Sequence, residues 1–210
     1  MSEFSESYHL EADTQQDGIR LLQRAGLTGW VFPPKRHWPA TRGWVTILPR
    51  STFGEPPAAL IEANEGWLLH YLLDQDAGWM FAAYTGPVLT SRYECRWLDW
   101  SDPQNRIKTD ASDVDVEAIW ALAKRHGRNP QLLELQRILH PRIVRQTDQE
   151  TGTQWDSFAD WPAGRTLDNV AYAFARLLAL PHYGWLRWRD DMSNDIECLQ
   201  EGAVKVGFGS

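Results

Sequence analysis

The segment WLLHYLLDQDAGWMFAAYTGPVLTSRYECRWL, residues 67–98, decides the fold class of this chain. It contains three strand-like runs, and the links between them are short enough to be hairpin turns. The run from Trp67 to Leu73 is apolar on both faces except at His70, which predicts a central strand. The run from Thr90 to Trp97 alternates between polar and apolar residues, which predicts one wet face. Residues 67–98 are therefore expected to form an antiparallel meander.

Upstream of this segment, the sequence predicts two more strands, a helix and an N-terminal tail before a short strand. The strands are expected at 29–32 and 43–48, so the β-rich region begins near residue 29. The helix is expected from an N-cap at Asp13 to a stop at Gly26, because its apolar residues recur at helical spacing. Residues 1–7 read as a frayed tail before a short strand at 8–12.

Downstream, the apolar period changes to that of helices. A helical hairpin is predicted, with one helix capped by Ser112 or Asp113 and a second opening at Asn129-Pro130. A third helix is expected from about Leu167 to Leu180. The remaining predictions are a long surface loop over 146–165 and strands at 183–188 and 203–206.

This order of elements predicts the α+β class. The expected fold has a central, mostly antiparallel sheet over about 29–98, packed against three to four helices. We expect one domain over 1–210, with a β-rich part at 1–105 and a helix-rich part at 106–210 that returns to the sheet.

Charge and cysteine content indicate where in the cell the protein is found and which partners it binds poorly. The chain has 210 residues and a net charge of −7, with −5 carried by residues 1–105 and −2 by residues 106–210. An acidic chain is soluble and binds nucleic acid or an anionic membrane poorly. No apolar run has the length of a membrane span, and the N-terminal residues are acidic where a signal peptide is basic. We therefore expect a cytoplasmic protein without membrane attachment, in which Cys95 and Cys198 are reduced.

The sequence contains twelve tryptophans, and five of them follow a glycine. Each glycine–tryptophan pair precedes a strand-like run, which favours a structural role at the entry to the sheet. The alternative is an aromatic platform for a sugar, a base or a partner protein. Trp38, Trp155 and Trp161 lie in loop-like contexts, so these three are the candidate binding residues.

Motifs for catalysis or metal binding are missing from the sequence. It has no phosphate-binding loop, nucleophile elbow, zinc-protease helix or paired cysteines, and its six histidines do not cluster at ligand spacing. We therefore predict no metal and no cofactor. The candidate acid–base residues are His70 and Glu94 on neighbouring strands and the pair Asp190 and Asp191. For His70, a hydrogen-bond partner is expected among Tyr71, Tyr93 and Glu94.

Three hypotheses about function remain open. The first is a non-catalytic, acidic protein-binding domain of the kind that immunity or inhibitor proteins provide. The second is a small enzyme with a site at the sheet edge that uses His70 and Glu94, or Asp190 and Asp191. The third is a nucleic-acid binder that uses the basic stretch from Lys124 to Arg145, which the acidic composition of the chain disfavours. We favour the first, with another protein as the partner and the oligomeric state left open.

Overall fold

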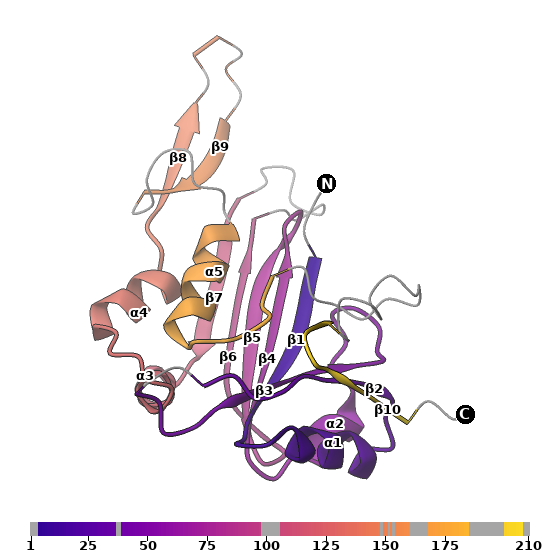
Figure 1. The fold of residues 1–210 in the computed structure, drawn as a ribbon. Coiled ribbons are helices and arrows are strands. Elements are labelled where there is room, and N and C mark those ends of the chain that lie inside the picture. The colour runs from indigo at the N-terminus through magenta and orange to yellow at the C-terminus, as the bar shows by residue number, and fades with distance from the viewer. Residues whose placement is uncertain are drawn as a thin grey trace.

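Eight strands form one sheet in which every neighbouring pair is antiparallel (Figure 1). The computed structural model describes residues 4–36, 39–97, 106–147, 149–150, 152, 154–159, 168–184 and 200–207. The strands of the sheet, in their spatial order, are β10 (Val204–Val206), β2 (Gly29–Val31), β3 (Trp44–Pro49), β1 (Phe4–Glu11), β4 (Trp67–Asp74), β5 (Gly78–Thr85), β6 (Val88–Arg96) and β7 (Lys108–Asp113).

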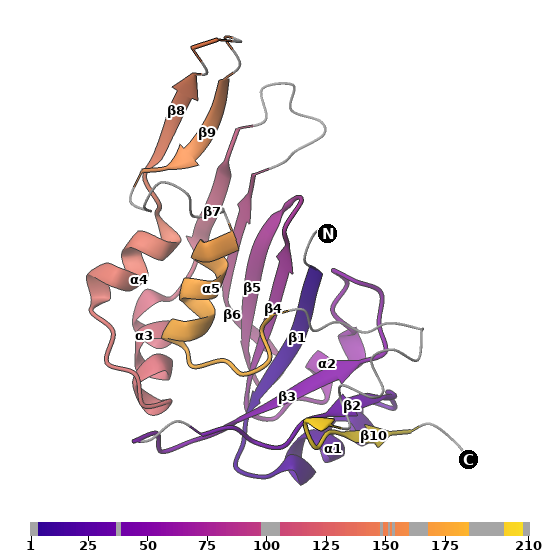
Figure 2. The ribbon, with the colours of Figure 1, turned by 45° about the horizontal axis from the view of Figure 1, so that its top comes forward.

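Helices cover both faces of this sheet (Figures 1 and 2). On one face lie α3 (Val116–Arg125), α4 (Leu132–Leu139) and α5 (Asp168–Leu177), and on the other lie α1 (Gln15–Arg24) and α2 (Ala58–Glu62). The larger core is built from aromatic residues of β3 to β6 that pack against α3, α4 and α5. Of the helices that the structure describes, none is both long and apolar enough to span a bilayer.

The α+β class and the antiparallel sheet agree with the sequence-based prediction, and the topology differs from it in one respect. The strands from β4 to β7 follow one another as a meander, but β1 lies between β3 and β4 and interrupts the order over 29–98. The described part of the chain also contains five helices where three to four are expected, because the short helix α2 leaves no periodic pattern in five residues.

The N-terminal residues differ most from the structure that the sequence predicts for them. Residues 4–7, expected to belong to a frayed tail, form the first half of β1, and the second half matches the short strand predicted at 8–12. β1 pairs with β4 from Phe4 to Leu10 and with β3 from Tyr8 to Glu11. Polar residues in this strand, such as Ser5 and Ser7, are fully buried. Their polarity resembles that of a terminal tail, so the sequence pattern conceals a central strand.

Helix α1 is present as predicted, but its N-cap is Thr14 and not Asp13. The carboxylate of Asp17 accepts hydrogen bonds from the backbone nitrogen and the hydroxyl of Thr14, at 3.2 and 2.7 Å. Asp13 instead pairs with Arg36 and Arg42. Gly26 ends the helix with a φ of 64°, as its place in the sequence predicts.

Strand β7 occupies the place where the start of a helix was expected. Its residues from Lys108 to Asp113 are mostly exposed and charged, so they carry no apolar alternation. Helix α3 is therefore capped by Asp115, whose side chain accepts a hydrogen bond from the backbone nitrogen of Ala118 at 2.9 Å. The predicted hairpin of α3 and α4 is confirmed, although α4 begins at Leu132, after the Asn129-Pro130 pair.

Two strands lie in a region where the sequence predicts none, and where a long surface loop is expected from residue 146 onward. β8 (Ile143–Thr147) and β9 (Gln154–Phe158) form a separate two-stranded antiparallel sheet. The prediction of a loop over 146–165 is therefore wrong for these strands. The predicted strand at 203–206 is confirmed as β10, whereas residues 185–188 of the strand predicted at 183–188 lie outside the described residues.

Four of the five glycine–tryptophan pairs are described, and each lies at the entry to a strand. The two glycines inside strands are required by close packing of backbones. A Cβ atom on Gly78 would lie 2.2 Å from the carbonyl oxygen of Cys95, and one on Gly29 would lie 2.5 Å from that of Leu48. The tryptophans that follow these glycines, Trp79 and Trp30, are buried. The structural role is thus supported at these positions.

Candidate functional site

His70 lies at the middle of β4 and forms a buried hydrogen bond with Glu6 of β1. Its Nε2 is 2.8 Å from the Oε1 of Glu6, and the two side chains are 0% and 6% exposed. The register of β1 and β4 places Tyr8 opposite His70, and the two rings stack with their centroids 4.4 Å apart. The partner of His70 is therefore Glu6, and not Tyr71, Tyr93 or Glu94, because β1 rather than β6 is its neighbour.

Glu6 is held by two further donors. The hydroxyl of Tyr8 donates to Oε1 at 3.3 Å, and the backbone nitrogen of Gly54 donates to Oε2 at 3.0 Å. Burial, reinforced by the carboxylate of Glu6, raises the pKa of Tyr8 far above its usual value, so the phenol stays protonated and donates. All these donors serve folding: they tie β4 and the loop at residue 54 to β1.

Glu94 lies on the same face of the sheet as His70 but does not meet it. Across β5, His70 lines up with Arg92, whereas Glu94 lines up with Leu72. The carboxylate of Glu94 accepts from the Nε of Arg96 at 2.5 Å and lies 3.8 Å from a guanidinium nitrogen of Arg92. The structure thus gives each candidate a separate partner and does not combine them into an acid–base pair.

A cavity of about 240 Å³ lies beside Glu94 at the end of β4 and β5. Its walls are mainly apolar and include Phe53, Leu72 and Met80. Its charged residues are Asp74, Glu94 and Arg96, and neither Glu6 nor His70 lines it. The buried histidine is therefore separate from this apolar cavity, which contains the candidate residue Glu94.

The other candidates are only partly described. Asp190, Asp191, Trp38 and Trp161 lie outside the described residues, as does Cys198. The backbone of Trp155 belongs to β9, where it pairs with Gln146 of β8. Cys95 is buried, and burial raises its pKa to about 12, so it is an unreactive thiol that packs as a small apolar residue.

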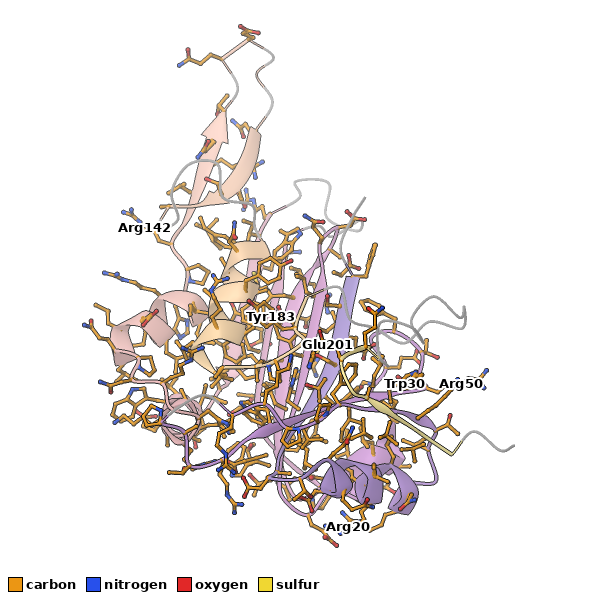
Figure 3. All side chains as sticks on the ribbon, in the orientation of Figure 1. Arg20, Trp30, Arg50, Arg142, Tyr183 and Glu201 are labelled. Carbon is orange, nitrogen blue, oxygen red and sulfur yellow. The ribbon has the colours of Figure 1, made fainter. Side chains whose placement is uncertain are left out.

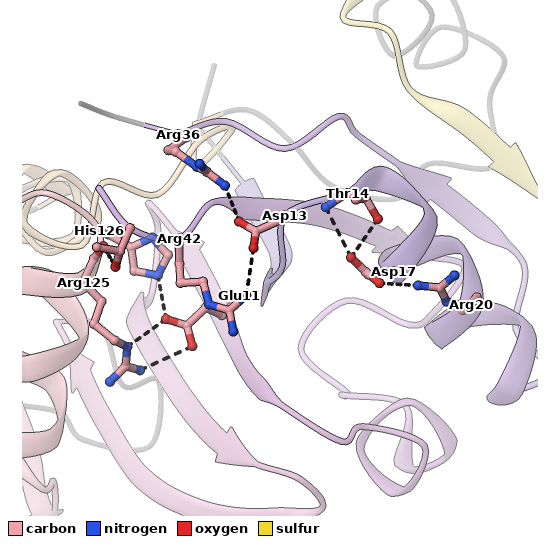
Figure 4. A network of polar contacts seen from close by, with 10 residues as sticks. Glu11, Asp13, Thr14, Asp17, Arg20, Arg36, Arg42, Arg125 and His126 are labelled. Carbon is pink, nitrogen blue, oxygen red and sulfur yellow. Dashed lines mark hydrogen bonds and ion pairs between the residues drawn. The ribbon is translucent and has the colours of Figure 1, made fainter. Parts of the chain in front are cut away.

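A polar network that the sequence did not predict ties the end of β1 to the end of α3 (Figure 4). Arg125 binds both oxygens of Glu11, with its Nε at 2.9 Å and its Nη2 at 3.4 Å. The Nε2 of His126 lies 3.3 Å from the same carboxylate, and its ring stacks on Trp44 at 4.0 Å. Burial works to raise the pKa of Glu11, but the bonds from His126 and Arg125 outweigh it and lower the pKa. This network clamps the helical layer to the sheet.

His9 occupies a second buried site on the face of the sheet that packs against α3 to α5. Its Nε2 is 2.9 Å from the hydroxyl of Ser7, and its Nδ1 is 3.3 Å from that of Thr46. Burial lowers the pKa of His9 to about 3, and the positive charges of other histidines act in the same direction. The ring is therefore neutral, and no carboxylate in the described network orients it for catalysis.

The strands β8 and β9 form an arm that extends away from the helices and the main sheet (Figures 1 and 2). Its base is anchored, because Phe158 is buried and Ile143 packs against the main core. Arg142, whose carbonyl accepts from the backbone nitrogen of Ala159 at 2.8 Å, marks this base in Figure 3. Asp156 adds a link to the body by accepting from the backbone nitrogen of Ile107 at 3.0 Å.

Beyond its base, the arm presents polar side chains to solvent. Arg145, Gln146 and Thr147 of β8 are exposed, and Arg145 pairs with Asp156 across the arm at 2.9 Å. Gln146 donates to the hydroxyl of Ser157 at 2.7 Å. Among the strands that the structure describes, β8 and β9 pair only with each other, so each has an outer edge without a strand partner.

Comparisons of the chain with protein families, with characterised proteins and with solved structures found no match. Among the described residues, no group of three or more histidine, cysteine or acidic side chains could hold a metal ion. The interpretation of function therefore depends on the geometry of the sites described above.

Proposed function

We propose that this chain is a non-catalytic protein-binding domain, of the kind that immunity or inhibitor proteins provide, and that the β8–β9 arm contacts its partner. The arm is the observation that carries this proposal. An isolated two-stranded sheet is only marginally stable in water, and this one extends beyond the core that anchors it. Two free strand edges and exposed polar side chains are what a partner uses when it adds a strand or grips a hairpin.

The state of the candidate catalytic groups supports the same proposal over an enzyme. His70 and His9 are fully buried, and each is bound to neighbours inside the core. Glu94 is bound by two arginines. A general acid or base has to reach a substrate proton. His70 and His9 are buried in contacts between strands, and Glu94 is paired with arginines of its own strand.

The position of Trp155 on the arm adds to this proposal. Its backbone lies in β9, opposite Gln146, so the tryptophan belongs to an element that extends from the body. Tryptophan is enriched among the residues that dominate binding energy in protein interfaces. The binding role assigned to Trp155 from the sequence therefore remains part of the proposal.

The test shortens the arm without disturbing its base. Residues 147–154 are replaced by Asn-Gly, because Gln146 and Trp155 are directly opposite and a two-residue turn can join them. The immobilised wild-type and shortened chains are used to capture proteins from extracts of the source cells. We expect a partner that binds the wild type in a defined ratio, survives gel filtration with it, and is lost from the shortened chain.

The matched control changes a different hairpin. Val88 and Leu89 are exposed at the start of β6, so a V88T/L89T variant alters a second hairpin without touching the arm. It should keep the partner. Capture of the same proteins by all three chains, or of nothing above the empty support, would contradict the proposal.

A further inference from the structure

A cleft of about 410 Å³ lies where the turn between α3 and α4 meets the C-terminal part of α5. Arg128, Asn129 and Pro130 line it from the turn, and Ala173, Arg176 and Leu177 line it from α5. The two arginines are 48 positions apart in the numbering of the chain and meet only because α4 and α5 pack together. The cleft is separate from the arm, which begins at Ile143.

The turn that carries Arg128 is fixed in place. Gly127 has a φ of 74°, and the backbone nitrogen of Arg128 donates to the carbonyl of Ala123 at 3.0 Å. The indole nitrogen of Trp120 donates to the carbonyl of Pro130 at 3.0 Å and holds the other end. Because the backbone is already ordered, a ligand in the cleft does not have to order it.

Arg128 and Arg176 make no ion pair with any residue that the structure describes. Their state contrasts with that of the arginines elsewhere, several of which pair with carboxylates: Arg20, Arg24, Arg36, Arg42, Arg125 and Arg145. The chain has 28 acidic residues against 21 basic ones, so acidic partners are plentiful. Two arginines that meet in one cleft without such partners leave an excess of positive charge there.

The walls of the cleft indicate the chemistry of its ligand. Two guanidinium groups bind carboxylates with two hydrogen bonds each, and Pro130, Ala173 and Leu177 offer apolar surface to the carbon chain of an acidic residue. Glu134 also lines the cleft and lowers its net positive charge. A carboxylate-bearing peptide with apolar residues between its acids fits the two arginines and the apolar walls, provided that its carboxylates lie away from Glu134.

Nucleic acid fits the same surface less well. Two of the basic residues in the stretch from Lys124 to Arg145 are already engaged, because Lys124 lies 3.2 Å above the ring of Trp120 and Arg125 is bound to Glu11. Tight binding of nucleic acid needs many phosphate contacts, and the cleft offers only two arginines.

We infer that the cleft between the α3–α4 turn and α5 binds an acidic peptide segment of a partner protein, with Arg128 and Arg176 holding its carboxylates. This inference goes beyond the proposed role of the arm, since it concerns a second surface made of different elements. The two proposals fail separately, because a chain with a shortened arm keeps the whole cleft.

The experiment measures binding of a short fluorescent peptide in which glutamate and alanine alternate, by anisotropy at low ionic strength. The variants are R128Q, R176Q and the double variant, and the control is R137Q, which removes the same charge from an exposed position of α4 outside the cleft. We expect each cleft variant to weaken binding by about fivefold, which corresponds to one exposed charge pair. The fold-loss of affinity in the double variant should be at least the product of the fold-losses in the two single variants. The affinity of R137Q should differ from that of the wild type by less than about twofold.

Three further binding measurements complete the experiment: one with a second peptide, one with the shortened chain and one with DNA. A peptide with glutamine in place of glutamate should not bind, and the chain with the shortened arm should bind the acidic peptide as the wild type does. The inference is overturned if the wild type does not bind the acidic peptide, or if R137Q weakens binding as much as R128Q. The inference is also overturned if single-stranded DNA binds more tightly than the peptide and this binding is lost in R128Q and R176Q. The cleft would then be a nucleic-acid site.

Discussion

At the scale of single residues, Glu6 is an acceptor on which three donors depend, two of them buried side chains. His70, Tyr8 and the backbone of Gly54 all bind its carboxylate. Removing an acceptor of this kind leaves polar groups without a partner in a medium where water cannot replace it. The pair of Glu6 and His70 is therefore better explained by strand pairing than by catalysis.

Glu6→Ala should lower the free energy of unfolding by about 3 kcal/mol, because it leaves a buried histidine, a phenol and a backbone nitrogen without their acceptor. Urea denaturation followed by tryptophan fluorescence measures this change. Glu62→Ala is the control, since Glu62 is exposed at the end of α2, and it should change stability by less than about 0.5 kcal/mol. A loss below about 1 kcal/mol for Glu6→Ala would show that the three donors find other partners.

His9 should make stability depend on pH. Its pKa is about 3 in the folded chain and near 6.5 when unfolded, so below pH 6.5 the unfolded chain binds a proton that the folded chain does not. The free energy of unfolding then falls by about 1.4 kcal/mol for each pH unit below 6.5 and is unaffected above it. His9→Gln should lack this contribution to the slope of the free energy of unfolding against pH, between pH 6 and 5. This holds whatever the absolute stability of the variant.

Denaturation at several pH values measures that slope. His140→Gln provides the comparison, because His140 follows α4 and is exposed, outside the core that surrounds His9. Equal slopes in the wild type and His9→Gln would mean that the buried ring takes up a proton in the folded state.

At the scale of elements, strands that alternate or are fully apolar could be located from the sequence, and strands made of polar residues could not. The ranges of β2 to β6 follow the predicted runs closely, since each carries apolar residues with a period of two or an unbroken apolar run. The strand predicted at 8–12 matches the second half of β1, where Tyr8 and Leu10 share a face. Polar residues are common in the first half of β1 and in β7, β8 and β9, which form because neighbouring strands or an ordered base accept their hydrogen bonds. Such tertiary causes leave no local pattern.

The same limit applies to the candidate site. His70 could be selected because an ionisable ring interrupts an apolar strand, but its partner Glu6 belongs to a segment that reads as a tail. Arg125 and His126 could be recognised as cations at the end of a helix, whereas their acceptor Glu11 lies 114 positions from Arg125. The convergence of Arg128 and Arg176 depends on how α4 packs on α5, which residue types alone do not determine.

The glycine–tryptophan pairs give a test at the scale of strand entry. Gly78→Ala should destabilise the chain by about 2 kcal/mol or more, because its Cβ would press on the carbonyl of Cys95 in the neighbouring strand. Gly66→Ala is the matched control, since Gly66 also precedes a tryptophan and has open space where the Cβ would lie. It should change stability by less than about 0.5 kcal/mol. Equal effects in the two variants would show that strand β6 moves aside freely.

At the scale of the whole molecule, the sheet is joined by segments from both ends of the chain. β1, from the N-terminal end, lies between β3 and β4, while β10 adds the last strand beside β2. Removing a strand from the middle of a sheet deprives two neighbours of hydrogen bonds at once. Removing part of the arm affects only two strands outside the main sheet.

Deletion of residues 1–7 should therefore abolish cooperative unfolding, since it takes away the part of β1 that pairs with residues 71–74 of β4 and also removes Glu6. The chain with the shortened arm should unfold cooperatively, within about 1 kcal/mol of the wild type. Thermal and urea unfolding, followed by circular dichroism, compare the two. A cooperative transition in the chain without residues 1–7 would show that residues 8–11 of β1 are enough to join β3 and β4.

The central place of β1 also bears on how the chain is made in the cell. β1 is synthesised before both of its neighbours, since β3 ends at Pro49 and β4 at Asp74. At ordinary rates of synthesis, the interval between the end of β1 and the end of β4 is on the order of seconds. Tyr8 and Leu10, which end up in the core, are therefore made well before the strands that flank them on both sides. The sheet can close around β1 only after β4 has been made.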